Sequence, residues 1–182
     1  MLQLLLFRHA KSDWTVASRG DFDRPLAERG RRDAPRMGAY MREHAIMPDL
    51  VLCSTARRTR ETLDLLLVEL TPAAVKLRSA PPRVDFEEAL YLAESFDLLD
   101  RVRMVPRGVA RVMLVGHNPG MHELAMDLAG AGARADRTRL AGKFPTAALA
   151  VITFEVADWS EVALARGRLE RFVTPRELPG TS

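Results

Sequence analysis

After Met1 the sequence reads Leu2-Gln3-Leu4-Leu5-Leu6-Phe7-Arg8-His9-Ala10-Lys11, which is the clearest indication of the fold of this chain. Residues 2–7 form an almost continuous apolar run, which is typical of a strand buried on both faces of a parallel sheet. The run ends abruptly in Arg8 and His9. Because ligands of open α/β sheets bind beyond the carboxyl ends of the strands, these polar residues are the first candidates for a functional site.

Further apolar runs predict more strands, and the segments between them have the periodicity of amphipathic helices. We expect strands at residues 50–53, 83–86, 111–115 and 147–154, and a weaker strand or two within 159–173, near a turn at Gly167. We expect helices within 27–45 and over 55–70, one with Ser95 as its N-cap, and one with Asn118 and Pro119 as its N-cap and first residue. This alternation predicts an α/β fold, a three-layer α/β/α sandwich with a mostly parallel central sheet, as a single domain over residues 1–182.

Prolines and glycines refine these expectations. Pro35 should kink the helix within 27–45 or mark a late start of it. The proline-containing segment Thr71–Pro82 is expected to be an irregular excursion. Gly130 and Gly132 should end the helix that begins near Asn118, and the arginine-rich segment after them is expected to be a solvated loop.

The composition is that of an ordinary globular protein of 182 residues, with 47% hydrophobic residues and a formal net charge of +3. No apolar run approaches the roughly 20 residues that a membrane span needs, so we expect no membrane partner. Met1 leads straight into an apolar run without a basic n-region, and a single cysteine permits no internal disulfide, so we expect a cytoplasmic protein. Basic and aromatic residues do not alternate in a block, so nucleic acid is not an expected partner.

Polar residues follow three of the predicted strands. They are Arg8, His9 and Lys11 after the first strand, Ser54, Arg58 and Thr62 after the second, and His117 and Asn118 after the strand at 111–115. Equivalent ends of parallel strands lie at one edge of a sheet, so these side chains should converge there. Two histidines among several arginines predict a site for an anion that a histidine can attack.

The residue types also predict how such an attack would work. A neutral imidazole can attack phosphorus with one ring nitrogen while the other donates to a backbone carbonyl that sets the tautomer, so we predict His9 as the nucleophile. The transferred phosphoryl group spreads charge over three oxygens, which Arg8 and Arg58 can bind, with His117 as a further donor and without a metal or other cofactor. Helix N-termini near Ser54 and Asn118 should add oriented N–H groups.

Other residues of suitable chemistry have simpler explanations. His44 and His122 are expected to be surface or partly buried residues without a role in function, and Arg57 and Arg60 are expected to be solvated. Cys53 should pack as a small apolar residue at its strand end.

The same residues resemble motifs of the histidine phosphatase superfamily, the phosphoglycerate mutase-like group. Leu6-Phe7-Arg8-His9-Ala10 resembles its Arg-His-Gly signature. Ser54 through Thr62 resembles its second motif, in which a serine precedes an arginine by four residues and a threonine follows that arginine by four, which selects Arg58 over Arg57. Val115-Gly116-His117-Asn118 resembles its late motif, which supplies the second active-site histidine. The resemblance covers roughly the whole chain and implies the phosphoglycerate mutase-like fold.

Within this superfamily the chain is most similar to the SixA-type branch. The matching segments are Arg8-His9-Ala10-Lys11-Ser12-Asp13-Trp14, Asp23-Arg24-Pro25-Leu26, Arg29-Gly30, Leu90-Tyr91, Gly116-His117-Asn118-Pro119-Gly120 and Lys143-Phe144-Pro145-Thr146. The resemblance implies that His9 becomes phosphorylated, that Arg8, Arg58 and His117 bind the phosphoryl group, and that water then releases phosphate. Ser54, Thr62, Asn118 and Lys11 are the predicted substrate-binding residues.

Two departures from the superfamily pattern bear on mechanism. Ala10 stands where the superfamily usually has glycine, although the SixA-type branch tolerates alanine there. No residue matches the general acid, because Asn118 stands where acid-phosphatase members have aspartate and the chain lacks the long insertion that supplies a glutamate in the mutases. Glu87 and Glu88, near a predicted strand end, are the candidates for a substitute.

The missing acid favours a particular leaving group. An alkoxide needs a proton, because alcohols are about as weakly acidic as water (pKa ~15.7), whereas the conjugate acid of imidazole titrates near ~6.5. We therefore predict a phosphatase that acts on phosphohistidine in a protein such as a phosphorelay component. The alternatives are a phosphatase of small phosphoesters and a non-catalytic phosphate-binding module, the second of which the intact His9, Arg8, Arg58 and His117 disfavour.

Overall fold

The computed structural model describes residues 1–15, 20–76 and 80–179, with the backbone alone for residues 72–76. The strands are β1 (Leu2–Arg8), β2 (Leu50–Ser54), β3 (Arg83–Glu87), β4 (Arg111–Gly116), β5 (Ala129–Gly132), β6 (Leu149–Phe154) and β7 (Gly167–Val173). The α-helices are α1 (Glu28–Glu43), α2 (Arg57–Lys76), α3 (Ser95–Arg103), α4 (Gly120–Leu128) and α5 (Arg134–Gly142).

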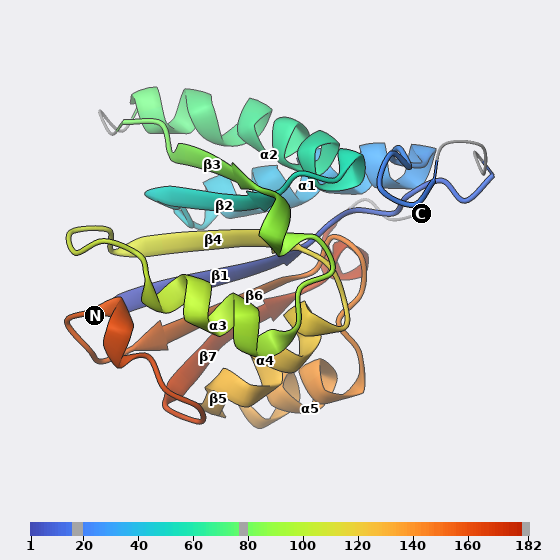
Figure 1. Cartoon of the computed structure of the whole chain (residues 1–182). Coiled ribbons are helices and arrows are strands. Elements are labelled where there is room, and N and C mark those ends of the chain that lie inside the picture. Colours follow the sequence, from blue (N-terminus) through green and yellow to red (C-terminus); the bar gives the residue numbers. More distant parts are fainter. Residues whose placement is uncertain (16–19, 77–79, 180–182) are drawn as a thin grey trace.

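All of these strands form one seven-stranded sheet, in the order β3-β2-β4-β1-β6-β7-β5. The strands β3, β2, β4 and β1 are parallel neighbours, β6 runs antiparallel to both β1 and β7, and β5 pairs parallel with β7. Helices α1 and α2 cover one face of the sheet, and α3 and α4 cover the other (Figure 1). The predicted α/β sandwich with a mostly parallel sheet is confirmed, with β6 as the strand that runs against the others.

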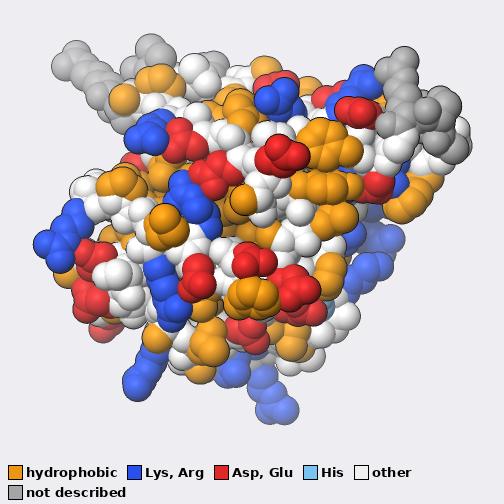
Figure 2. All heavy atoms as spheres, in the orientation of Figure 1, with side chains coloured by type: hydrophobic (Ala, Val, Ile, Leu, Met, Phe, Trp, Pro, Cys, Tyr) orange, Lys and Arg blue, Asp and Glu red, His pale blue; other side chains and the backbone are white. Residues whose placement is uncertain are grey.

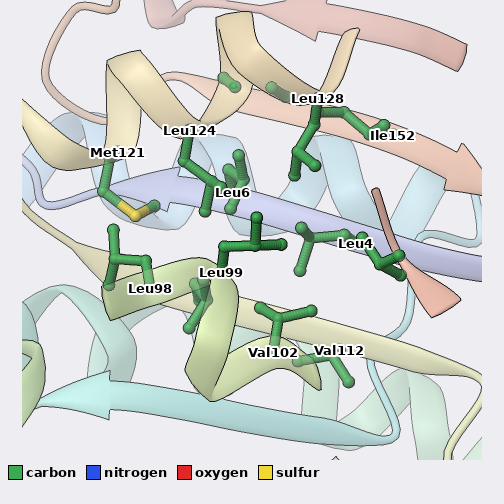
Figure 3. Close-up of a cluster of buried hydrophobic side chains, with 14 of the residues drawn as sticks. Leu4, Leu6, Leu98, Leu99, Val102, Val112, Met121, Leu124, Leu128 and Ile152 are labelled. Atoms are coloured by element: carbon green, nitrogen blue, oxygen red, sulfur yellow. The ribbon is translucent and has the colours of Figure 1, made fainter. Parts of the chain in front are cut away.

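The first strand contributes to the hydrophobic core on both faces of the sheet. Leu4 and Leu6 pack on the side of α3 and α4, where Figure 3 shows them among leucine, valine and methionine side chains of those helices and of β4. Leu5 and Phe7 pack on the other side, against residues of α1 and α2. All four side chains are fully buried. This two-sided burial explains the continuous apolar run and anchors the strand that carries His9.

The carboxyl ends of β1, β2 and β4 lie together at one edge of the sheet. Arg8 is in register with Gly116, and Cys53 is in register with Val115. The predicted convergence of three polar segments at this edge is therefore confirmed.

Helix α1 lies within the predicted range 27–45, whereas α2 extends beyond its predicted end at residue 70. Pro35 lies inside α1, so a late start at that residue is wrong. The buried face of Ala34, Met37 and Met41 packs into the core, and this burial outweighs the one backbone hydrogen bond that a proline removes. Helix α2 continues to Lys76 and so includes the start of the predicted excursion at Thr71. Residues 77–79 of that segment lie outside the described residues.

Both predicted N-caps are wrong by one residue. The N-cap of α3 is Glu94, and Ser95 is already helical. Pro119 is the N-cap of α4, which begins at Gly120, while the Asn118 amide donates instead to the carbonyl of Phe144. A Cβ atom at Gly120 would lie 2.0 Å from the carbonyl oxygen of Ala93, so this close approach requires glycine.

The region after α4 also differs from the prediction. Helix α4 ends at Leu128, and the alanines and glycines that follow form β5 rather than a simple helix end. The arginine-rich segment predicted to be a loop is α5, which buries Leu140. Within residues 159–173 a short 3-10 turn at Trp159–Glu161 precedes one strand, β7, which begins at Gly167.

Candidate active site

A cavity of about 290 Å³ opens at the edge of the sheet where β1, β2 and β4 end. Its lining includes all four predicted catalytic residues and two of the predicted substrate-binding residues. The lining residues are Arg8, His9, Lys11, Ser12, Trp14, Asp21, Arg24, Arg58, Leu92, His117, Asn118 and Thr146. The predicted residues Ser54 and Thr62 do not line the cavity; both are fully buried behind it.

His9 is held in the state that a nucleophile requires. Its Nδ1 atom lies 2.7 Å from the carbonyl oxygen of Ala10, to which it donates, so the predicted contact with a backbone carbonyl is confirmed. Burial, and then the positive charges of Arg58 and Arg8 and the neighbouring His117, hold the pKa of His9 well below its usual value, although the Ala10 carbonyl opposes this. The ring is therefore neutral at pH 7, with Nε2 as the nitrogen that carries a free electron pair.

His117 faces His9 across the site, with 5.2 Å between the ring centroids. Burial and the charge of Arg58 lower the pKa of His117 to about 3, so this ring is also neutral at pH 7. Its Nε2 atom lies 2.8 Å from Oγ of Ser54, and its buried Nδ1 atom has no partner among the described residues. With the Ser54 hydroxyl donating to Nε2, the ring proton resides on Nδ1, which can donate to an anion.

Arg8 and Arg58 each use terminal N–H groups of the guanidinium in hydrogen bonds within the protein, while their Nε donors are unused. Arg8 donates through Nη1 to the carbonyl of Phe144 at 2.8 Å. Arg58, whose side chain is only 2% exposed, donates to the Asp21 carbonyl at 2.6 Å and to the Asp21 carboxylate at 2.9 Å. The Nε atoms of both arginines are buried without a hydrogen-bond partner in the described part of the chain. A bound phosphoryl group would supply acceptors for such donors.

Thr62 braces the loop that carries His9. Its hydroxyl accepts a hydrogen bond from the Ala10 amide at 3.0 Å and donates to the Arg58 carbonyl at 2.6 Å. This one side chain therefore connects the segment after β1 with the first turn of α2. The structure places Thr62 as a positioning residue for Ala10 and Arg58, behind the surface that a substrate can reach.

Asp21 and Arg24 line the cavity and Tyr91 lies beside it, and the sequence predicted no role for any of the three. Asp21 forms an ion pair with Arg24 at 2.9 Å and accepts a hydrogen bond from the Tyr91 hydroxyl at 2.6 Å, in addition to its contacts with Arg58. Burial alone raises the pKa of Asp21, but the hydrogen bond from Tyr91 and the charges of Arg58 and Arg24 outweigh it and lower the pKa below its usual value. Arg24 and Tyr91 lie in segments that resemble the SixA-type branch, and this resemblance could have identified them as site residues. No motif in the sequence points to Asp21.

Both candidates for a general acid lie away from the cavity. Glu87 accepts hydrogen bonds from the guanidinium of Arg101 at 2.6 to 3.0 Å, and Glu88 is exposed on a short 3-10 turn. Neither lines the catalytic cavity, in which Asp21 is the one carboxylate among the described lining residues.

The residues given simpler explanations are likewise outside the cavity. Arg57 pairs with Glu61 at 2.6 Å, and Arg60 lies over the ring of Phe86. Cys53 is fully buried, and this burial raises the pKa of its thiol. In the residues that the structure describes, no group of three or more His, Cys, Asp or Glu side chains could hold a metal ion, and no helix could cross a membrane.

Comparisons with known proteins agree with this site. A family model for the histidine phosphatase superfamily (branch 1) matches residues 4–80. An uncharacterized protein of Mycobacterium leprae is 34% identical over 176 residues, covering 93% of this chain and 99% of that relative. This relative therefore matches the chain over nearly its whole length.

Two solved structures are similar in both fold and sequence. The proposed phosphohistidine phosphatase SixA of Nakamurella multipartitia is 27% identical with a TM-score of 0.79, and 96% of each chain is covered. The proposed phosphohistidine phosphatase SixA of Agrobacterium tumefaciens is 29% identical with a TM-score of 0.78, covering 96% of this chain and 98% of that one. From its site and from these similarities, the chain belongs to the SixA-type branch of the histidine phosphatase superfamily.

Proposed function

We propose that this histidine phosphatase hydrolyses phosphohistidine carried by another protein, through a phosphoryl group held covalently on His9. The observation that carries the proposal is the state of Asp21, the carboxylate of the cavity. Two arginines and the Tyr91 hydroxyl hold it ionised, because together they lower its pKa. It has no proton to give to a leaving group at neutral pH.

The first step transfers the phosphoryl group to His9. The Nε2 electron pair attacks phosphorus, and the P–N bond to the substrate imidazole breaks. The electron pair of that bond leaves with the substrate nitrogen, which takes a proton from solvent. The Nδ1–H to Ala10 hydrogen bond stabilises the charge that develops on the His9 ring, and Arg8, Arg58 and His117 donate to the phosphoryl oxygens.

The second step releases phosphate. Water attacks the phosphorus of phosphoryl-His9, and the electron pair of the P–Nε2 bond returns to Nε2. The proton lost by the water passes to solvent, inorganic phosphate leaves, and His9 is neutral again. Because burial lowers the pKa of His9, the neutral ring is regenerated without a dedicated base.

The leaving group decides between the two catalytic hypotheses. Imidazole leaves readily because its conjugate acid has a pKa near ~6.5, whereas an alkoxide needs a proton from an acid. Asp21 is ionised and Glu87 is bound to Arg101, so the described cavity has no carboxylic acid for an alkoxide. This environment favours a P–N bond over a phosphoester.

The residues at the mouth of the cavity support the proposal that the substrate is carried on a protein. Trp14 and Leu92 line the cavity, although their side chains are 67% and 50% exposed. Trp14 also stacks on the guanidinium of Arg24, 3.4 Å from the ring centroid. Exposed apolar side chains beside a polar site are typical of surfaces that bind other proteins.

A cytoplasmic location and the absence of a metal requirement stay predictions.

The test compares phosphate release from a phosphohistidine peptide and from an alkyl phosphoester, glycerol phosphate, in EDTA. We expect release from the peptide to be the faster reaction and to disappear in His9→Ala. The matched control is His44→Ala, which removes a histidine outside the cavity and should leave both rates unchanged. Faster release from glycerol phosphate would reject the phosphohistidine proposal and favour a small-molecule phosphatase. No turnover of either compound would favour a phosphate-binding module.

A further inference from the structure

A second cavity, of about 330 Å³, borders the catalytic one and shares three of its residues. The shared residues are Arg8, Lys11 and Thr146, and the second cavity extends from them to Arg29, Lys143 and Arg176. We call this second cavity the basic groove. Because the two cavities share a wall, a substrate bound to His9 can reach into the groove without leaving the catalytic cavity.

The basic groove concentrates positive charge. Five of its lining residues are lysine or arginine, and none of its described lining residues is a carboxylate. The chain has only three lysines, and two of them, Lys11 and Lys143, lie here. Arg29 pairs with Asp33 at 3.3 Å, whereas neither groove lysine forms an ion pair with a described residue.

The face drawn in Figure 2 has a different character. Basic and acidic side chains are interspersed over much of this face. In the groove, neither Lys11 nor Lys143 has an acidic partner among the described residues, which creates a local positive potential beside the catalytic cavity. An anionic group of the substrate would compensate this potential.

The wall of the groove is attached firmly to the catalytic residues. The carbonyl of Phe144 accepts hydrogen bonds from both Arg8 and Asn118. The Ala147 amide donates to the carbonyls of Arg8 and His9 at 3.0 and 3.1 Å. The segment from Lys143 to Thr146 is therefore held at a constant position relative to His9, which allows the groove to select what flanks the phosphorylated group.

Resting on the proposed function, we propose that the basic groove binds acidic side chains that flank the phosphohistidine of the substrate protein. Carboxylates complement lysine and arginine, and their attraction at an exposed rim raises the rate of encounter more than the rate of the chemical step. The groove thus selects among phosphohistidine proteins by the charge next to the modified residue. This preference should weaken as salt increases.

The test uses two phosphohistidine peptides that differ only in their flanking residues, three glutamates in one and three glutamines in the other. At low ionic strength we expect wild-type kcat/KM to be about tenfold higher for the glutamate peptide, chiefly through KM. Lys143→Glu should abolish or reverse this preference. The matched control is Arg166→Glu, which makes the same charge change at the exposed residue before β7, outside the groove, and should retain the preference.

The outcomes separate this inference from the proposed function. Equal kcat/KM for the two peptides in the wild type, or a preference that Lys143→Glu leaves unchanged, would overturn the groove inference while the proposed function stands. Turnover of glycerol phosphate without turnover of either peptide would overturn the proposed function itself. A third outcome would assign the groove to a second phosphate. In it the wild type prefers butanediol bisphosphate to butanediol monophosphate, Lys143→Glu loses this preference, and both peptides are used equally. This result would overturn the acidic-segment proposal.

Discussion

The hydroxyl of Ser54, the last residue of β2, lies 2.8 Å from Nε2 of His117, which follows β4. The other ring nitrogen, Nδ1, is buried and has no partner within the described residues. When Nδ1 donates to a phosphoryl oxygen it carries the proton of the neutral ring, and the Ser54 hydroxyl then donates to Nε2. Ser54, which does not line the cavity, therefore orients the ring of His117, which does line it.

Replacing this partner should impair the chemical step. In Ser54→Ala the Nε2 atom loses a buried hydrogen bond, whose removal costs about 1–3 kcal/mol, and the ring can exchange tautomers. We expect kcat on the phosphohistidine peptide to fall about tenfold or more, since each 1.4 kcal/mol corresponds to about a factor of ten in rate. Steady-state kinetics measures this. An unchanged kcat in a variant with a wild-type circular dichroism spectrum would show that Ser54 does not orient His117.

The role of Thr62 in positioning the site can be measured separately from the contribution of Thr62 to stability. Thr62→Val keeps the shape of the side chain but breaks the hydrogen bonds to Ala10 and Arg58. The free energy of unfolding in urea should fall by about 1–3 kcal/mol, and kcat should fall severalfold. The matched control is Thr59→Val in the same helix, because the Thr59 hydroxyl donates to the nearby carbonyls of Ser54 and Ala56 and not to Ala10 or Arg58.

Thr59→Val should lose stability while it retains most of its activity. If the two valine variants lose the same share of kcat for the same loss of stability, Thr62 has no specific role in positioning the site.

Asp21 opposes the binding of anions that Arg58 favours. In Asp21→Asn the side chain keeps its shape and can still accept from Tyr91, but the negative charge next to Arg58 and Arg24 is removed. We expect the inhibition constant of inorganic phosphate to fall about tenfold, or about 1.4 kcal/mol. Asp23→Asn makes the same charge change at an exposed residue outside the cavity and should have little effect. Weaker phosphate inhibition in Asp21→Asn would mean that Asp21 is needed to hold Arg58 in place.

Buried His117 should make the protein less stable in mild acid. Its pKa is about 3 in the folded protein and near ~6.5 in the unfolded chain, so between these values the unfolded state binds more protons. Stability therefore rises with pH through this window and is lost as pH falls below 6.5. Between pH 7 and pH 5 this one histidine should cost about 2 kcal/mol.

The comparison with His117→Gln removes this titration, while His9 stays buried and the carboxylates stay in place in both proteins. Urea unfolding at pH 7 and pH 5 should give the wild type a larger loss of unfolding free energy by about that amount. Equal losses in the two proteins would show that His117 is not kept neutral by burial.

Several features of the fold could be predicted because they follow from local patterns. The apolar run at residues 2–7 indicated a strand buried on two faces, and Leu4 and Leu5 do pack on opposite sides of the sheet. By contrast, β5 consists of alanine and glycine and has no apolar period to reveal it. It is a strand because it pairs with β7, more than thirty residues later, and no local pattern records such pairing.

The residues of the site fall into the same two groups, those that a local pattern predicts and those that it does not. From the sequence alone it follows that His9, Arg58 and His117 each come after a buried strand, and parallel pairing then brings them to one edge, because the ends of such strands must meet. The remaining residues of the site depend on tertiary contacts. Asp21, in the segment before α1, meets Arg58 in the first turn of α2 and Tyr91 after β3, 37 and 70 residues away in the chain, and these contacts depend on how the helices and the sheet pack together. Strand burial leaves a periodic record in the sequence, whereas contacts between distant segments leave none.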